Sequence, residues 1–292
     1  MTEKRKMRWV CAVVALLMML TGCRGTAKNV SSDDGWSLVT AKSVLTVGIY
    51  TDRFPMAYVN ENEISGYDVD LMTEIALRLG VSAKFVSLSE KRDTAEDLLN
   101  QSKIDCAVGA ISYSAELERT YLLSEPYLTD QKLMVMRQDS PMKNLSDFTG
   151  KTLAMTQAMQ NNSSIAESPL FLASFASIAY PESDEAAVNQ VVSGEADAAV
   201  VNQTVADYFI TDGKPLCYLA NDAEGVESFG SMQYVVAFAL KNQALQKKVA
   251  DAYATMVRDG VIDTLQAKWF GDSNPVNRTK SALEKSAAQA TE

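Results

Sequence analysis

The chain has 292 residues, enough for one large domain or two smaller domains with separate hydrophobic cores. It holds 27 Lys and Arg against 37 Asp and Glu, and a net charge of −10 repels nucleic-acid phosphates. It contains no histidine and only four cysteines, a composition that argues against zinc sites and histidine-activated nucleophiles. We therefore expect no metal, no cofactor and no nucleic-acid partner.

The first 22 residues predict a secretory signal. Four basic residues precede position 9, and the apolar run at residues 9–20 is too short to span a bilayer of about 30 Å. Residues 20–23 then read Leu-Thr-Gly-Cys, which resembles the lipobox of bacterial lipoproteins. The resemblance implies that Cys23 is lipidated and anchors the mature protein to a bacterial membrane, at the cell surface or in the periplasm. The alternative is a plain secretory signal in which this cysteine has no role.

Two polar segments flank the region that we expect to fold. Residues 23–43 are predicted to form a flexible tether, and residues 273–292 a loose polar tail. Removing the signal removes four basic residues and one acidic residue, so the net charge changes from −10 to −13. No later segment has 18 consecutive apolar residues, and no transmembrane helix is expected.

The first part of the folded region alternates strand-like and helix-like segments. Residues 44–50 (VLTVGIY) are rich in β-branched side chains and predict a strand. Apolar residues at helical spacing predict a helix over 68–79, ended by Gly80. The alternation continues with a strand at 83–88, a helix at 93–102 and a buried strand at 104–111. This order predicts a mainly parallel sheet flanked by helices.

A second series of short segments predicts a second lobe. Its expected strands lie at 133–136, 152–156, 197–202 and 217–220, and its main helices at 185–193 and 203–211. An apolar strand at 234–240 and helices at 243–258 and 261–269 then complete the folded region. Cys106 and Cys217 fall in different lobes, so we expect two buried thiols and no disulfide.

Several short strings occur in a characteristic order between residues 44 and 272. They are VLTVG at 44–48, GYDVDLMTEIALRLG at 66–80, KIDCAVGAIS at 103–112, SEPY at 124–127, GKTLAM at 150–155, GEADAAVV at 194–201 and KWFG at 268–271. Together they resemble the extracellular solute-binding proteins of family 3, which serve ABC importers of polar amino acids.

The resemblance implies a type II periplasmic-binding-protein-like fold with two α/β lobes. Lobe 1 would comprise residues 44–127 and 233–272, and residues 128–232 would form lobe 2 and two hinge strands. The crossings would lie near 128–131 and 228–232. A small polar solute would bind between the lobes, at the carboxyl ends of the strands, and closure would present it to an ABC permease. A monomer without catalytic residues is expected.

Three elements that hold an α-amino acid in this family are altered here. Relatives hold the carboxylate with an arginine three residues after a threonine; by counting back from SEPY, these positions are Leu117 and Ser114. The aspartate that holds the ammonium group is replaced by Asn202. Arg119 restores the carboxylate site if the loop is shifted by two residues. The changes imply that the cleft does not hold a standard α-amino acid in the usual way.

The third altered element follows the strand at 152–156. The family's Gly and Ser or Thr, whose backbone amides assist the carboxylate, become Ala158 and Met159, followed by Gln160. Arg53 and Arg92 fall where the family often places an aromatic ring, with Phe54 as the alternative stacking residue. We hypothesise that the two arginines bind an anionic or amide-rich group. The alternative is that both are exposed loop residues.

The expected ligand-binding set therefore combines charged, aromatic and neutral polar side chains. It consists of Arg53, Phe54, Arg92, Gly109, Ser112, Ser114, Arg119, Thr156, Met159, Gln160 and Asn202.

Two other functions remain open on the same expected fold. One is an enzyme, such as a dehydratase, which requires a carboxylic acid or lysine with a shifted pKa in the cleft. No acidic residue falls on a ligand position mapped from the family. The other is a binding or sensory module that presents its liganded state to a receptor instead of a permease.

Overall fold

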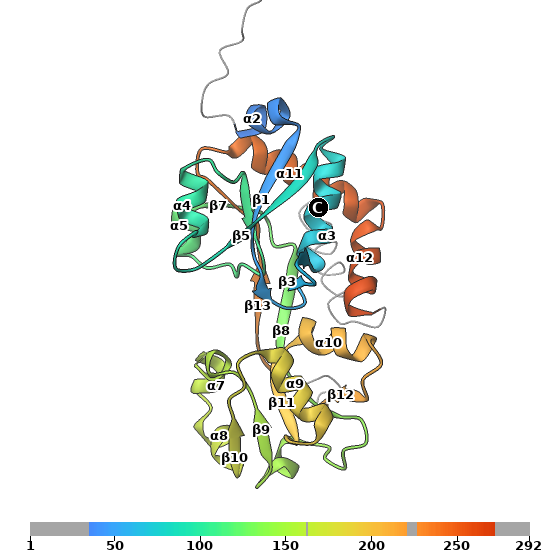
Figure 1. Cartoon of the computed structure of the whole chain (residues 1–292). Helices are drawn as coiled ribbons and strands as arrows, with labels where there is room; N and C mark the ends of the chain where they lie inside the picture. The colour runs from blue at the N-terminus through green and yellow to red at the C-terminus, as the bar shows by residue number, and fades with distance from the viewer. Residues whose placement is uncertain (1–34, 162, 221–226, 272–292) are drawn as a thin grey trace, which may run out of the picture.

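The structure, a computed structural model, describes residues 35–161, 163–220 and 227–271. Two lobes lie end to end and are joined by two long strands (Figure 1). The predicted signal sequence, Cys23 and the expected polar tail lie outside the described residues. The main sheet of each lobe is separate, and a further small sheet, β2-β3-β4, accompanies the first one.

The first lobe is built on a five-stranded sheet in the order β5-β1-β6-β14-β7. The parallel part consists of β1 (Val44–Tyr50), β5 (Ser82–Leu88) and β6 (Cys106–Val108). Two short strands, β14 (Ala237–Phe238) and β7 (Leu122–Leu123), extend it in the antiparallel direction. The sheet is therefore mixed, with the expected parallel pairing confined to its first three strands.

Helices cover both faces of this sheet. They are α3 (Tyr67–Arg78), α4 (Ala95–Asn100), α5 (Leu117–Thr120), α11 (Gln243–Arg258) and α12 (Val261–Phe270). The apolar stripe of α3 packs into the lobe core through Leu71, Met72 and Ile75, all almost fully buried. Burial of each such side chain contributes about 1.5–3 kcal/mol, which fixes α3 against the sheet.

The expected tether is wrong in its last part, because residues 35–42 form a helix, α2 (Gly35–Lys42). Val39 of α2 is fully buried in the first core, and Gly35 packs so closely on Asn242 that a Cβ atom would lie 2.6 Å from it. Lys42 Nζ also lies 3.2 Å from Asp105 Oδ1. The helix therefore belongs to lobe 1.

A small antiparallel sheet, which the sequence pattern did not predict, follows β1. It consists of β2 (Asp52–Arg53), β3 (Ala57–Asn60) and β4 (Glu63–Ser65). It carries residues 52–60 away from the main sheet and toward the second lobe (Figure 1).

The second lobe contains a six-stranded sheet, ordered β10-β9-β11-β8-β12, with β13 also paired to β8. Its strands are β8 (Leu128–Arg137), β9 (Thr152–Ala154), β10 (Ser177–Ala179), β11 (Ala198–Asn202), β12 (Leu216–Tyr218) and β13 (Ser228–Tyr234). Only β10, β9 and β11 pair in parallel, and all pairing with β8 is antiparallel. This sheet is also mixed.

Short helices surround the second sheet, and two longer ones face the first lobe. The short ones are η1 (Leu145–Phe148), α6 (Gln157–Gln160), α7 (Ser163–Ala166) and α8 (Pro169–Ser174). The longer ones are α9 (Asp184–Ser193) and α10 (Gln203–Thr211). In Figure 1, α10 lies below α12 of lobe 1, and α9 lies beside it.

The two crossings between the lobes are the paired strands β8 and β13. Leu128 pairs with Tyr234 and Asp130 with Met232, with a register shift between Ser228 and Ser231. The expected crossings at 128–131 and 228–232 lie on these two strands. The predicted single strand at 234–240 is wrong, because the chain stops pairing with β8 at Tyr234 and resumes as β14 in the first sheet.

Candidate functional site

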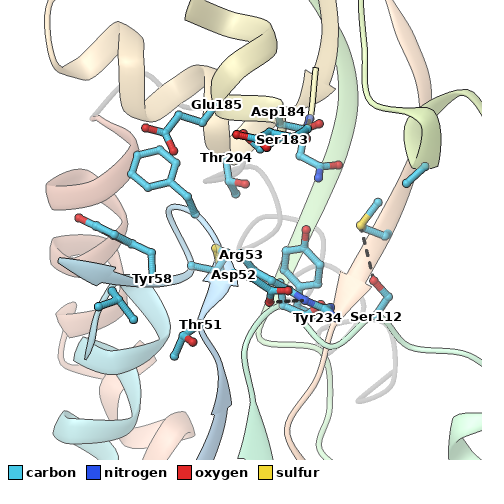
Figure 2. Close-up of a pocket in the computed structure, with 18 residues that line it drawn as sticks. Thr51, Asp52, Arg53, Tyr58, Ser112, Ser183, Asp184, Glu185, Thr204 and Tyr234 are labelled. Carbon is cyan, nitrogen blue, oxygen red and sulfur yellow. Dashed lines mark hydrogen bonds and ion pairs between the residues drawn. The ribbon is translucent and has the colours of Figure 1, made fainter. Parts of the chain in front are cut away.

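A cavity of about 800 Å³ lies between the two lobes. Its lining comes from the loop after β1 with the small sheet, the loop after β6, the start of α9, the end of β11 and the hinge strand β13. These are the carboxyl ends of strands, where α/β sheets generally bind ligands. Figure 2 shows polar side chains from both lobes directed toward this space.

Arg53 lines the cavity, but its guanidinium group is already engaged by the protein. Nη2 lies 2.9 Å from Glu90 Oε1, and Nη1 donates a hydrogen bond of 3.2 Å to the carbonyl oxygen of Ala110. Nε lies 3.8 Å from Asp52 Oδ1, and Cζ lies 4.7 Å from the centre of the Tyr50 ring. Arg53 is thus held in place by neighbours that neutralise its charge.

Phe54 also lines the cavity and contacts aromatic residues of the other lobe. Its ring meets Tyr208 edge-to-face, with centroids 4.7 Å apart, and lies 6.0 Å from Phe209, both on α10. Tyr58 of β3 contacts the same ring at 4.9 Å. Tyr208 in turn stacks with Trp269 of α12 at 6.1 Å. Phe54 therefore helps to join the lobes at one edge of the cavity.

Two other expected residues, Ser112 and Asn202, line the cavity. The Ser112 hydroxyl donates to the sulfur of Met232 at 3.6 Å. The Asn202 backbone N–H donates to Asp184 Oδ2 at 3.0 Å. The side-chain oxygen of Asn202 is buried, and it has no hydrogen-bond partner among the described residues.

Four expected residues of the first lobe do not line this cavity. Arg92 and Arg119 are exposed on the turn before α4 and on α5. The Ser114 hydroxyl accepts from the Leu117 N–H at 3.1 Å. Gly109 has φ 111°, and a Cβ atom there would lie 2.7 Å from Tyr50 N, so it permits close packing of two strands. The hypothesis of paired arginines in the cleft is therefore wrong for Arg92.

Three expected residues of the second lobe are structural in this arrangement. The Thr156 hydroxyl caps α6 by accepting from the Met159 N–H at 3.0 Å. Met159 is buried in the second core, and Gln160 lies in hydrogen-bonding range of Gln157 at 3.5 Å. Ala158, between them, is the residue of α6 that reaches the cavity.

Four carboxylates of the cavity lining were not predicted from the sequence: Asp52, Glu182, Asp184 and Glu185. The last three surround Ser183, whose hydroxyl caps α9 by accepting from the Ala186 N–H at 3.1 Å. Burial raises the pKa of Asp184 to about 6, although the hydrogen bond from the Asn202 N–H acts in the opposite direction. The Ser-Asp-Glu cap was visible in the sequence, but only the fold brings it opposite Asp52.

A buried polar network lies beneath the cavity. Asp130 on the hinge strand accepts hydrogen bonds from the Thr204 N–H at 3.1 Å, the Thr204 hydroxyl at 2.7 Å and the Tyr234 hydroxyl at 2.9 Å. Burial raises the pKa of Asp130. Lys132, also buried, has its pKa lowered by desolvation, against the influence of Asp130 and Asp184.

The sequence from residue 45 to residue 272 matches the family described as bacterial extracellular solute-binding proteins, family 3. The chain belongs to this family. It is 26% identical to the L-cystine-binding protein TcyA of Bacillus subtilis over 89% of this chain and 97% of that protein. It is 24% identical to the arginine-binding extracellular protein ArtP of the same organism, over 90% and 98% respectively.

Solved structures share the fold of this solute-binding protein. An ancestral cationic amino acid solute-binding protein superposes with a TM-score of 0.68 at 24% identity, covering 80% of this chain and 99% of the other. The expected two-lobe type II fold is thereby confirmed. Leu117, which the spacing from SEPY predicts at the position of the carboxylate-binding arginine, packs half-buried against the first-lobe core.

Two aspartates in the first turn of α3 make tertiary contacts. Asp68 is fully buried, and its Oδ2 accepts from the Ala110 N–H and the Tyr127 hydroxyl, each at 2.9 Å. Burial raises its pKa to about 7. Asp70 Oδ2 accepts from Lys268 Nζ at 2.6 Å and Trp269 Nε1 at 2.8 Å. Asp68 thus fixes the loop that carries Ala110 into the cavity wall.

The part of the chain that the structure describes offers neither a metal-binding cluster nor a membrane-spanning helix. No group of three or more Cys, Asp or Glu side chains there is arranged to hold a metal ion. No helix in the same residues has the length and apolar character needed to cross a bilayer.

Proposed function

We propose that this solute-binding protein captures a small polar solute, amino-acid-like or a derivative, and delivers it to an ABC permease. The observation that carries the proposal is the polar cavity between two lobes that are connected by only two strands. Its named relatives bind L-cystine and arginine. The altered clamp positions support a solute that is held differently from a standard α-amino acid.

Capture would proceed by rotation of the lobes about β8 and β13. A solute that contacts Asp52 and Tyr58 of lobe 1 together with Asn202 and Glu185 of lobe 2 binds the closed state better than the open one. This difference in affinity shifts the population toward closure. The permease would then recognise the closed, loaded form.

Attachment to a membrane through Cys23 completes the proposal. Two or more acyl chains at this position would give firm anchoring, at about 0.8 kcal/mol for each buried methylene. The described helix α2 begins twelve residues after Cys23, so the intervening residues would connect the anchor to lobe 1. We propose that the anchored protein acts as a monomer.

The test is a thermal-shift screen of the full-length protein in detergent against amino acids, their derivatives, short peptides and organic acids. A true solute at 100 times its Kd adds about 2.7 kcal/mol to the free energy of unfolding. Small-angle scattering with that solute should show a smaller radius of gyration. Absence of any stabilising solute contradicts capture, whereas binding without an effect of gene deletion on uptake supports a sensory role.

A second candidate function is an enzyme on the same fold. It is favoured by one observation: Asp184, with its pKa raised to about 6, faces the cavity, and Lys132, with its pKa lowered by burial, lies close enough to interact with it. A carboxyl group with such a pKa can exchange protons near neutral pH, and the neighbouring lysine has its pKa shifted toward that range. Chemical conversion of a bound solute, followed by mass spectrometry, would establish this function, and recovery of the unchanged solute would reject it.

A further inference from the structure

We propose that the cavity binds a small organic cation through its ammonium or guanidinium groups, and that the solute needs no α-carboxylate. This inference rests on the proposed function, because it names the class of solute for the same cleft. It is carried by the charges that line the cavity, by their distribution over the two lobes and by an unpaired acceptor in the wall.

The charge of the lining is strongly unbalanced. Four carboxylates, those of Asp52, Glu182, Asp184 and Glu185, face the cavity against one guanidinium group, that of Arg53. Arg53 is itself paired with Glu90, which lies just outside the lining. A concave site lined by one sign of charge concentrates ligands of the opposite sign.

The charged groups packed behind the wall do not reverse this balance. Asp130 lies beneath the cavity, hydrogen-bonded to Thr204, and Lys132 lies beside it on the same strand. One further acid and one further base leave the surplus of carboxylates unchanged. Glu90 adds another. The negative potential is therefore a property of the whole cleft region.

The carboxylates are divided between the lobes. Glu182, Asp184 and Glu185 surround the N-terminus of α9 in lobe 2, whereas Asp52 belongs to β2 in lobe 1. In Figure 2, Asp184 and Glu185 lie across the cavity from Asp52 and Arg53. Closure of the empty protein brings like charges together, which costs energy, and a cation between them removes that cost. Binding of a cation therefore favours the closed state.

The polar groups of the lining are better suited to a donor than to a carboxylate. Asn202 lines the cavity, and its shielded side-chain oxygen has no partner among the described residues, so a solute N–H that reaches it on closure of the lobes would satisfy it. The positions that hold a carboxylate in relatives offer no cation here, since Leu117 packs into the core and Arg119 is exposed outside the lining. A solute carboxylate would therefore meet charge repulsion, and the one guanidinium group of the lining, that of Arg53, is already engaged by Glu90 and the Ala110 carbonyl oxygen.

The experiment compares matched solutes by calorimetry with the full-length protein in detergent. Arginine is paired with agmatine and lysine with cadaverine, each pair differing by the carboxylate, and glutamine and glutamate supply neutral and acidic probes. We expect agmatine or cadaverine to bind at least as tightly as its amino acid, and glutamate not to bind. Binding of arginine without agmatine and of lysine without cadaverine, or preference for glutamine or glutamate, overturns the inference but leaves solute capture standing. Failure of every solute in the wider screen overturns both.

Charge-removing variants locate the interaction. Glu182→Gln combined with Glu185→Gln should raise the Kd for the bound cation by about tenfold or more, since each tenfold change is about 1.4 kcal/mol. Both residues are exposed, so the fold should be retained, as checked by thermal melting. The matched control is Glu195→Gln, an exposed acid beyond the opposite end of α9, which should leave the Kd unchanged. Equal Kd values for the double variant and the control overturn the inference.

Discussion

Single buried polar residues determine how the hinge and the cavity wall are held. Asp130 and Asp68 are both fully buried carboxylates, and each accepts a tyrosine hydroxyl and a backbone N–H. An unpaired buried carboxylate costs several times the energy of one hydrogen bond. Loss of a hydrogen-bond partner of either aspartate is therefore expected to lower the free energy of unfolding measurably.

Removal of the Tyr234 hydroxyl should destabilise the protein. Tyr234→Phe deletes the donor to Asp130 Oδ2 without changing the ring, so we expect a loss of about 1–3 kcal/mol in the free energy of unfolding. Urea denaturation measures it. Tyr180→Phe, at an exposed tyrosine of the same chain, is the control and should change stability little. Equal effects of the two variants would show that the hydroxyl of Tyr234 is not buried at the hinge.

Asp68 should make stability depend on pH. Because burial raises its pKa from 3.8 to about 7, the folded state binds a proton that the unfolded state releases. Its contribution is fully present below pH 3.8 and is lost as the pH rises to about 7, by up to about 1.4 kcal/mol for each pH unit. Asp68→Asn should remove this part of the decline between pH 5 and pH 7 in urea denaturation. A wild-type slope that persists in the variant contradicts the assignment.

For individual residues, the sequence predicted little of the site. Arg53, Phe54, Ser112 and Asn202, expected as ligand-binding residues from their distance to family strings, line the cavity, and their contact with a ligand stays a prediction. The carboxylates of α9 were missed, because their position opposite Asp52 depends on the packing of two lobes and not on spacing along the chain. The partners of Arg53 could not be inferred for the same reason.

Among the elements, strands with β-branched runs and helices with apolar stripes were predicted well. Residues 44–50 coincide with β1, and residues 243–258 with α11. The errors arose where a short segment draws its stability from tertiary contacts. Helix α2 has only a brief apolar stripe, and β2, β3 and β4 are too short to show alternation. The antiparallel parts of both sheets likewise follow from long-range pairing.

Helix α2 should contribute measurably to the stability of lobe 1. Val39→Ala creates a cavity in the first core and should cost about 1–3 kcal/mol of unfolding free energy. The neighbouring Leu38 is 40% exposed, so Leu38→Ala serves as the control and should have a small effect. Chemical denaturation of both variants measures the change in the free energy of unfolding. A harmless Val39→Ala would mean that these residues act only as a tether.

The whole molecule combines two cores that touch at the edge formed by α10 and α12. Tyr208 packs against both cores, and its ring meets Phe54 and Trp269 of the first lobe. Such aromatic pairs contribute about 0.5–1.5 kcal/mol each beyond burial. The contact holds the lobes close together at one side of the cavity.

Loss of this contact should let the lobes separate. Tyr208→Ala is expected to increase the radius of gyration of the unliganded protein and to weaken solute binding by several-fold, since fewer molecules adopt the competent state. Small-angle scattering and calorimetry measure the two effects. Tyr180→Ala, at an exposed tyrosine of the second lobe, should change neither. An unchanged radius for Tyr208→Ala would show that the hinge strands alone set the lobe spacing.

The register of β8 and β13 has a consequence for the architecture as a whole. Leu128 and Tyr234 pair with each other, so the chain leaves the first lobe and returns to it at adjacent positions. The two ends of the segment between these residues, which forms the second lobe, therefore lie next to each other. The pair is therefore a suitable junction for chimaeras between relatives, provided that the exchanged lobe keeps an aromatic side chain at Tyr208 to meet Phe54 and Trp269.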